Sequence, residues 1–334
     1  MEYLYQLLFF SSKLFIILIF ILLLLAAILG MATRSKDKLR GRISIKNLNK
    51  KYQETRETLS AEIMSKAQFK KFNKEQTKIN KRKEKKLDKQ KNIFIIHFNG
   101  DIKASAVSSL REEVTAILGV ATSHDEVVVK IESGGGMVHA YGLAASQLMR
   151  IRQQHIPLTV IVDKIAASGG YMMACIANKI LAAPFAIIGS IGVVAQLPNF
   201  HRLLKDKHID FEQITAGQYK RTLTLFGENT SKGREKMHEE IEDIHRLFKN
   251  LIKENRPTID IDSVATGEHW MGSQALTLNL VDELRTSDDY LFAQAKDAKL
   301  YEICYHMKKS FAEKMSTTAR ALMSGRSLED TYIM

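Results

Sequence analysis

The sequence predicts an α/β fold built on a mostly parallel sheet. Short apolar segments typical of buried strands alternate along the chain with longer segments of helical periodicity. The strand candidates are residues 93–98, 126–131 and 158–162, and the helix candidates are residues 107–118 and 137–153. Turns of small residues follow the second and third strands. In a parallel sheet these turns meet at the carboxyl edge, where ligands bind.

The two turns carry complementary chemistry. The first, Gly134–Gly136, can bring backbone N–H groups close to a developing oxyanion. The second places Ser168 between a strand and a helix, where its hydroxyl can be exposed as a nucleophile. The alternative is that Ser168 is an ordinary helix N-cap. If the turns share one site, acyl-transfer chemistry is the function that they indicate.

A serine nucleophile needs a general base, and the sequence offers two kinds. His139 and His201 could each complete a triad, although the GxSxG pattern is missing around Ser168. Lys220 follows a β-like segment at 211–215 and could be the base in a desolvated pocket. A lysine considered alone is usually a surface residue. The residues themselves leave this choice open.

Neither the cysteines nor the glycine turn indicates a metal or an organic cofactor. Cys175 and Cys304 are too few for a disulfide framework and lack the spacing of metal ligands. The turn at 134–136 lacks the dinucleotide-binding spacing, and the Walker A lysine is absent. We therefore expect no metal and no cofactor.

The N-terminus predicts a membrane anchor over residues 1–31. Residues 14–31 are an unbroken apolar run, which is long enough to span a bilayer. The alternative is a cleaved signal peptide. The run is longer than the usual apolar core of such a peptide, and no clear small-x-small cleavage site precedes the charged residues 34–42.

A basic arm is predicted over residues 32–92. It contains 21 Lys and Arg against 7 Asp and Glu, so it accounts for the whole net charge of +12. Because this charge adjoins the predicted span and no nucleic-acid-binding motif is present, we expect it to contact anionic lipid head groups and no nucleic acid. The segment 48–91 has no proline or glycine and predicts a solvated helix.

Five motifs in order resemble the signal-peptide-peptidase A family of serine peptidases, and the anchor and arm look most like its SohB branch. The motifs are ESGGGMV (132–138), SGGYMMA (168–174), GSIGVV (189–194), AGQYKR (216–221) and GEHWMGSQALTLNLVDEL (267–284). The chain departs from the family at Gly134, where a proline is common, and at Asn279, where a glycine is usual. Asparagine tolerates a positive φ, so the second change should cost little.

The resemblance implies a Ser/Lys dyad with Ser168 as nucleophile and Lys220 as general base. Gly135 or Gly136, with help from Gly169, would form the oxyanion hole. Ser190 would be either a supporting hydroxyl or part of a structural turn. A lysine base acts unprotonated, so the resemblance also implies activity that rises toward alkaline pH.

The implied fold is the ClpP/crotonase type, made of repeated ββα units that assemble into homo-oligomers. The peptidase domain would cover residues 93–300, followed by a tail or helix at 301–334. The implied activity is endopeptidase cleavage of apolar, extended or signal-peptide-like peptides. Two alternatives remain: a crotonase-like acyl-CoA enzyme, and a non-catalytic membrane-tethered scaffold.

The predicted location is a bacterial inner membrane with a single pass. The side of the catalytic domain is left open, because two lines of reasoning conflict. The family resemblance implies the periplasm, whereas the basic residues after the span favour the cytoplasm by the positive-inside rule.

Overall fold

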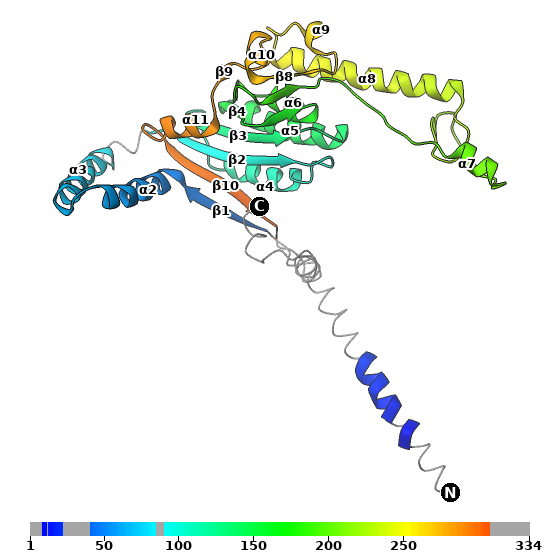
Figure 1. The fold of residues 1–334 in the computed structure, drawn as a ribbon, viewed down its shortest axis with the longest axis horizontal. Helices are drawn as coiled ribbons and strands as arrows, with labels where there is room; N and C mark the ends of the chain where they lie inside the picture. Colours follow the sequence, from blue (N-terminus) through cyan, green and yellow to red (C-terminus); the bar gives the residue numbers. More distant parts are fainter. Residues whose placement is uncertain (1–8, 12, 23–40, 85–89, 308–334) are drawn as a thin grey trace. The chain divides into compact units, whose positions relative to one another are not determined.

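The computed structural model describes residues 9–11, 13–22, 41–84 and 90–307 (Figure 1). The chain divides into two units, and the one that contains the sheet is Ile45–Cys304. This unit begins well before residue 93, so the arm and the expected peptidase domain are not separated at that boundary. The account below concerns this unit unless another is named.

The core of the fold is a largely parallel sheet, and the α/β class is confirmed. Strand order is β1-β10-β2-β3-β4-β6-β9, with parallel pairing from β10 through β9. A smaller layer joins it through β5, which pairs with β3 and β7, while β8 runs antiparallel to β7. The strands are β1 (Arg42–Asn47), β2 (Asn92–Gly100), β3 (Glu126–Ser133), β4 (Leu158–Val162), β5 (Ile165–Ala167), β6 (Lys179–Ala182), β7 (Ile187–Gly189), β8 (His269–Met271), β9 (Glu283–Leu284) and β10 (Lys299–His306).

Helices cover the sheet because its central strands are apolar on both faces. Val127, Val128 and Val129 are all fully buried, as expected for a parallel sheet with two covered faces. Helix α5 packs between α4 and α6, whereas the opposite core cluster includes residues of α2 and α11. The helices after the arm are α4 (Val107–Leu118), α5 (Val138–Gln153), α6 (Gly169–Ala174), α7 (His201–Asp206), α8 (Ser231–Asn255), α9 (Ile261–Val264), α10 (Gly272–Thr277) and α11 (Ser287–Gln294).

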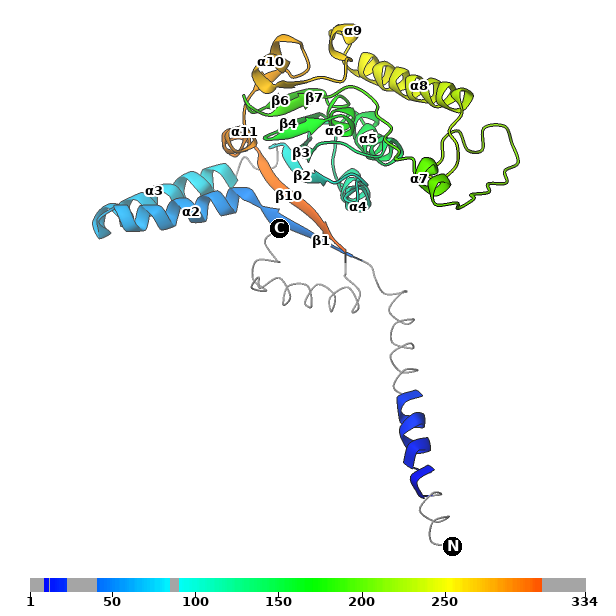
Figure 2. The same cartoon turned by 45° about the vertical axis from the view of Figure 1, so that its right-hand side comes forward.

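The arm forms a helical hairpin, which corrects the single helix expected over 48–91. Helices α2 (Leu48–Ile63) and α3 (Lys66–Glu84) lie side by side (Figures 1 and 2). The break has a local cause: the Gln68 side chain accepts the Ser65 N–H at 3.1 Å, while Ser65 Oγ accepts the Gln68 N–H at 3.4 Å. This reciprocal cap starts a new helix.

The start of the hairpin is part of the sheet domain. Leu48 is buried in the core, and the Asn49 side chain donates to the carbonyl oxygens of Ala295 and Ala298 while accepting the Leu300 N–H. At the other end of the chain, β10 continues to His306, so the expected boundary at residue 300 falls inside a strand. The rest of the predicted tail, 308–334, lies outside the described residues.

The predicted anchor is only partly within the described residues. Residues 13–22 are helical, and residues 23–31 lie outside the described part. Within the described ranges, no helix combines the length and the apolar character needed to cross a bilayer.

One predicted strand is wrong. Residues 211–215 form no strand and are exposed. They belong to the connection between β7 and α8, residues 193–230, which we call the outer segment. Both views show α7 and the coil before α8 at the far end of α8, away from the sheet (Figures 1 and 2). Apolar residues in this segment have no neighbouring strand with which to pair.

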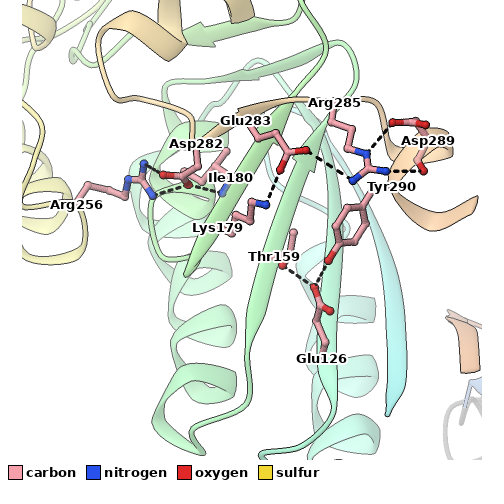
Figure 3. A network of polar contacts seen from close by, with 10 residues as sticks. All are labelled: Glu126, Thr159, Lys179, Ile180, Arg256, Asp282, Glu283, Arg285, Asp289 and Tyr290. Atoms are coloured by element: carbon pink, nitrogen blue, oxygen red, sulfur yellow. Dashed lines mark hydrogen bonds and ion pairs between the residues drawn. The ribbon is translucent and has the colours of Figure 1, made fainter. Parts of the chain in front are cut away.

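The opposite end of α8 is fixed to the sheet by an ion pair in which the Arg256 side chain is buried. Arg256 donates two hydrogen bonds to the Asp282 carboxylate, at 2.7 and 2.8 Å (Figure 3). It donates a third to the Asn279 carbonyl at 3.1 Å. Asp282 also accepts the Ile180 N–H at 2.7 Å. Asn279 has a φ of +58°, which an asparagine adopts at low cost.

Candidate active site

Strand pairing brings the two predicted turns together. Ser133, the last residue of β3, pairs with Ala166 of β5, so the turns that follow these strands are immediate neighbours. A Cβ atom built on Gly135 would lie 2.7 Å from the Ser168 Cβ and 2.7 Å from the Gly169 nitrogen. The proximity of the glycine turn and the serine is therefore a property of the sheet register.

Ser168 is held in a strained backbone conformation. Its φ of +51° and ψ of −116° are unusual for a residue with a side chain. Its N–H donates to the Gly189 carbonyl at 2.7 Å, and its own carbonyl accepts the Met172 N–H at 2.9 Å. The side chain makes no N-cap hydrogen bond to α6, so Ser168 does not act as an ordinary helix N-cap. Strain of this kind is concentrated at functional sites.

The glycine amides differ in what they already bind. The Gly135 N–H donates to Ser133 Oγ at 3.1 Å, so it is engaged inside the protein. No hydrogen bond from the Gly136 or Gly169 N–H is found among the residues that the structure describes. Of the expected oxyanion donors, Gly136 and Gly169 are thus the two whose N–H groups are available to a substrate. The Gly135 N–H is used to hold the turn.

Ser190 lies one residue beyond the contact that holds Ser168. It follows Gly189, whose carbonyl accepts the Ser168 N–H, and it has its own strained φ of +51°. Its N–H donates to the Glu268 carbonyl at 2.6 Å. Two strained serines thus end neighbouring parallel strands, β5 and β7. This placement is compatible with both roles expected for Ser190.

In the part of the chain that the structure describes, none of the predicted bases is hydrogen-bonded to Ser168. Lys220 is exposed in the outer segment, and within the described ranges no hydrogen bond or ion pair joins it to Ser168. His139 is exposed on α5 and His201 begins α7, and neither contacts the Ser168 hydroxyl.

Family models match nearly the entire chain. The model described as peptidase family S49 N-terminal matches residues 2–148, and the model described as peptidase family S49 matches residues 150–301. The chain belongs to peptidase family S49. The resemblance to signal peptide peptidase A and its SohB branch is thereby confirmed, and the chain is a peptidase by family.

Named relatives of this S49 chain are proteases. A Haemophilus influenzae protein named "Probable protease SohB" is 55% identical over 70% of this chain and 66% of its own length. A Buchnera aphidicola protein of the same name is 45% identical over 88% of this chain and 100% of its own length. Among solved structures, a 1510-N membrane-bound stomatin-specific protease matches with a TM-score of 0.43 at 14% identity, covering 69% of this chain and 98% of that one.

Sequence reasoning missed a groove in this S49 chain. It has a volume of about 580 Å³ and lies among α5, α6 and α8. Its walls begin at Val138, just after the glycine turn, and at Met172, one helical turn after Ser168. The signal in the sequence was the 4-3-4 spacing of small and apolar residues in α5. The lining residues are Val138, Gly142, Ala145, Ser146, Met149, Gln153, Met172, Ile176, Ile244, Leu247, Phe248 and Leu251.

Both cysteines have raised pKa values. Burial raises the pKa of Cys175 to about 12, so its thiol stays protonated and unreactive. Burial also raises the pKa of Cys304. Across the described ranges, no group of three or more His, Cys, Asp or Glu side chains is placed to hold a metal ion.

Proposed function

We propose that this S49 chain is a membrane-anchored serine endopeptidase that uses a Ser168/Lys220 dyad. The observation that carries the proposal is the strained Ser168, whose hydroxyl is not used as a helix cap, beside a glycine turn in which the Gly136 N–H is unengaged. Family membership supports a peptidase of the ClpP/crotonase type. A scaffold or a crotonase-like acyl-CoA enzyme would have no need of a strained serine at this position.

The chemistry is acyl transfer to water. Neutral Lys220 takes the Ser168 proton as the serine oxygen attacks the peptide carbonyl. The Gly136 and Gly169 N–H groups bind the oxyanion of the tetrahedral intermediate. The lysine returns the proton to the leaving amine, and the acyl-enzyme is then hydrolysed by a water that the same lysine activates. The sequence of steps uses only groups of the protein and water.

We propose that Lys220 reaches Ser168 of another copy of the chain. The outer segment that carries it also exposes large apolar side chains: Val194, Leu197, Phe200, Leu203, Ile209, Phe211, Ile214, Tyr219, Leu225 and Phe226 are between 37% and 94% exposed. Exposed apolar surface of this extent is typical of a protein interface. Formation of a homo-oligomer would both bury this apolar surface and complete the dyad.

The substrates that we propose are apolar, extended peptides. The groove among α5, α6 and α8 supports this, because nine of its twelve lining residues are Val, Ala, Met, Ile, Leu or Phe and it has no charged lining residue. Such a groove accepts apolar side chains and gives no compensation to a buried charge.

Tethering to a bacterial inner membrane belongs to the same proposal. Residues 14–31 would supply the anchor, and the basic hairpin would contact anionic lipid. Protease accessibility of the domain in intact spheroplasts decides the side of the membrane. Digestion places the domain in the periplasm, and protection places it in the cytoplasm.

The test uses the full-length chain in detergent as wild type, Ser168→Ala and Lys220→Ala. Each preparation is incubated with a mixed library of unfolded peptides, and the products are identified by mass spectrometry. Cleavage by the wild type and by neither variant supports the dyad. Cleavage retained in Lys220→Ala refutes the assignment of the base. If a verified wild-type oligomer cleaves nothing, the scaffold alternative is favoured.

Mixing the two inactive variants tests the exchange between copies. Random assembly of Ser168→Ala with Lys220→Ala would create intact sites in roughly a quarter of the positions, if each site takes its serine and its lysine from different chains. Restored cleavage supports exchange. Mixed oligomers that stay inactive, with the mixing verified by differently tagged chains, would show that the dyad forms within one chain.

A further inference from the structure

A chain of hydrogen bonds runs beneath the glycine turn. The Gly135 N–H donates to Ser133 Oγ at 3.1 Å, and Ser133 Oγ lies 2.5 Å from the Tyr141 hydroxyl oxygen. The Tyr141 hydroxyl donates to the Asp101 carbonyl at 2.8 Å. Ser133 Oγ also lies 3.3 Å from the Gly100 carbonyl oxygen, so its proton goes either to the Tyr141 hydroxyl or to that carbonyl. In both arrangements the hydrogen bonds link the glycine turn to the backbone at the end of β2.

The two hydroxyls are shielded from water. Ser133 is 2% exposed and Tyr141 is fully buried. Burial raises the pKa of Tyr141, so its hydroxyl remains a donor. Linked hydrogen bonds in a site of low dielectric polarise one another, and a break leaves buried groups unpaired. The chain of bonds is thus a rigid support.

The Tyr141 ring supports the other half of the site. A Cβ atom built on Gly169 would lie 2.3 Å from the Tyr141 Cγ, so the ring packs directly against the residue that follows Ser168. The ring also makes an edge contact with Phe98, with centroids 6.3 Å apart. One side chain therefore contacts the amide beside the nucleophile with its ring and reaches the glycine turn with its hydroxyl.

The turn is also held on its far side. The Met137 N–H donates to the Ile102 carbonyl at 2.8 Å, and a Cβ on Gly136 would lie 2.1 Å from that carbonyl oxygen. The amides on both sides of Gly136 are thus tied down. The Gly136 N–H between them is left free, with its direction fixed by its neighbours.

We propose that Ser133 and Tyr141 are positioning residues that aim the Gly136 N–H at the oxyanion. The inference rests on the proposed function, in which Gly136 and Gly169 hold that oxyanion. Neither side chain touches substrate. These two residues act on the stability of the transition state, so their substitution should lower kcat and leave KM nearly unchanged.

The test compares Tyr141→Phe and Ser133→Ala with the wild type in full-length protein, using one peptide found to be cleaved. Each substitution should lower kcat about tenfold, less than the loss of an oxyanion donor itself, and change KM less than about twofold. The double variant should be no slower than about the slower single variant, because both residues belong to one chain of bonds.

Tyr290→Phe is the matched control. Tyr290 is also buried, and its hydroxyl donates to Glu126 Oε1 at 2.6 Å (Figure 3). Glu126 begins β3, whereas the glycine turn follows the other end of that strand. The Tyr290→Phe substitution should lower the thermal unfolding temperature and leave kcat near the wild-type value. If kcat falls equally in Tyr141→Phe and Tyr290→Phe, or if the losses in Ser133→Ala and Tyr141→Phe multiply, the inference is overturned. If the wild type cleaves no more than Ser168→Ala, the proposed function itself has failed.

Discussion

Adding a single methyl group at neighbouring glycines should have opposite results. Gly134 lacks a positive φ, and a Cβ built there meets only the Ile165 Cδ1 at 3.8 Å, an ordinary contact. Gly135 has a φ of +89°, and its Cβ would lie 2.7 to 2.9 Å from atoms of Ala167, Ser168 and Gly169. Two of these three atoms are backbone atoms, which cannot turn away.

The magnitude for Gly135→Ala follows from two terms. The left-handed conformation costs a residue with a side chain about 1 kcal/mol, and overpacking against fixed backbone costs about 1–3 kcal/mol. The free energy of unfolding should fall by about 2–4 kcal/mol. Gly134→Ala should leave it unchanged or raise it by up to about 1 kcal/mol, because the unfolded chain loses freedom.

The two variants are compared by urea denaturation, which gives the free energy of unfolding, and by peptide cleavage, which gives kcat. Gly135→Ala should lose at least about 100-fold in kcat, since the clash displaces the oxyanion donors from Ser168. Gly134→Ala should keep activity within about threefold. Equal activity in the two variants, or a larger stability loss in Gly134→Ala, would refute this account of the turn.

Three further predictions concern the ion pair, acid stability and the base. Asp282→Ala should lower the free energy of unfolding by about 3 kcal/mol, because Arg256 is only 7% exposed and loses its partner. Asp262→Ala breaks an exposed ion pair and should hardly change the free energy of unfolding. Similar denaturation midpoints in the two variants would contradict this prediction. Burial opposes ionisation of Asp125, but hydrogen bonds from Asn92 and Thr122 outweigh burial and lower the pKa of this carboxyl group. The resulting stabilisation is complete above the ordinary Asp pKa and is lost as pH falls through the lowered pKa. The stability of Asp125→Asn should therefore depend less steeply on pH below about pH 4. Because a lysine base acts unprotonated, kcat/KM should rise toward alkaline pH, and a flat or acid-leaning profile would contradict the role of Lys220.

Elements with clear local periodicity were predictable from the sequence. The helix at 107–118 and the strand at 158–162 have the predicted bounds, because the spacing of apolar residues acts within a few residues. The neighbourhood of Ser168 and the glycine turn was also predictable, since parallel strands bring their carboxyl ends together.

Features that depend on distant partners were missed. The bond between Ser133 and Tyr141 joins the end of β3 to α5 and depends on how that helix packs, so no local pattern indicates it. The segment 211–215, Phe-Glu-Gln-Ile-Thr, has a β-like pattern, but among the described residues it forms no strand and is exposed. The break of the arm helix did have a signal, the S-x-x-Q pattern at 65–68, which was outweighed by the absence of proline and glycine.

The central claim is that Ser168 is the nucleophile, and covalent labelling tests it most directly. Full-length oligomeric protein is treated with a fluorophosphonate probe, digested, and mapped by tandem mass spectrometry. The account predicts one adduct, on Ser168, which disappears in Ser168→Ala and forms more slowly in Lys220→Ala. An adduct on another residue that persists in Ser168→Ala, in a preparation that cleaves peptides, would contradict it.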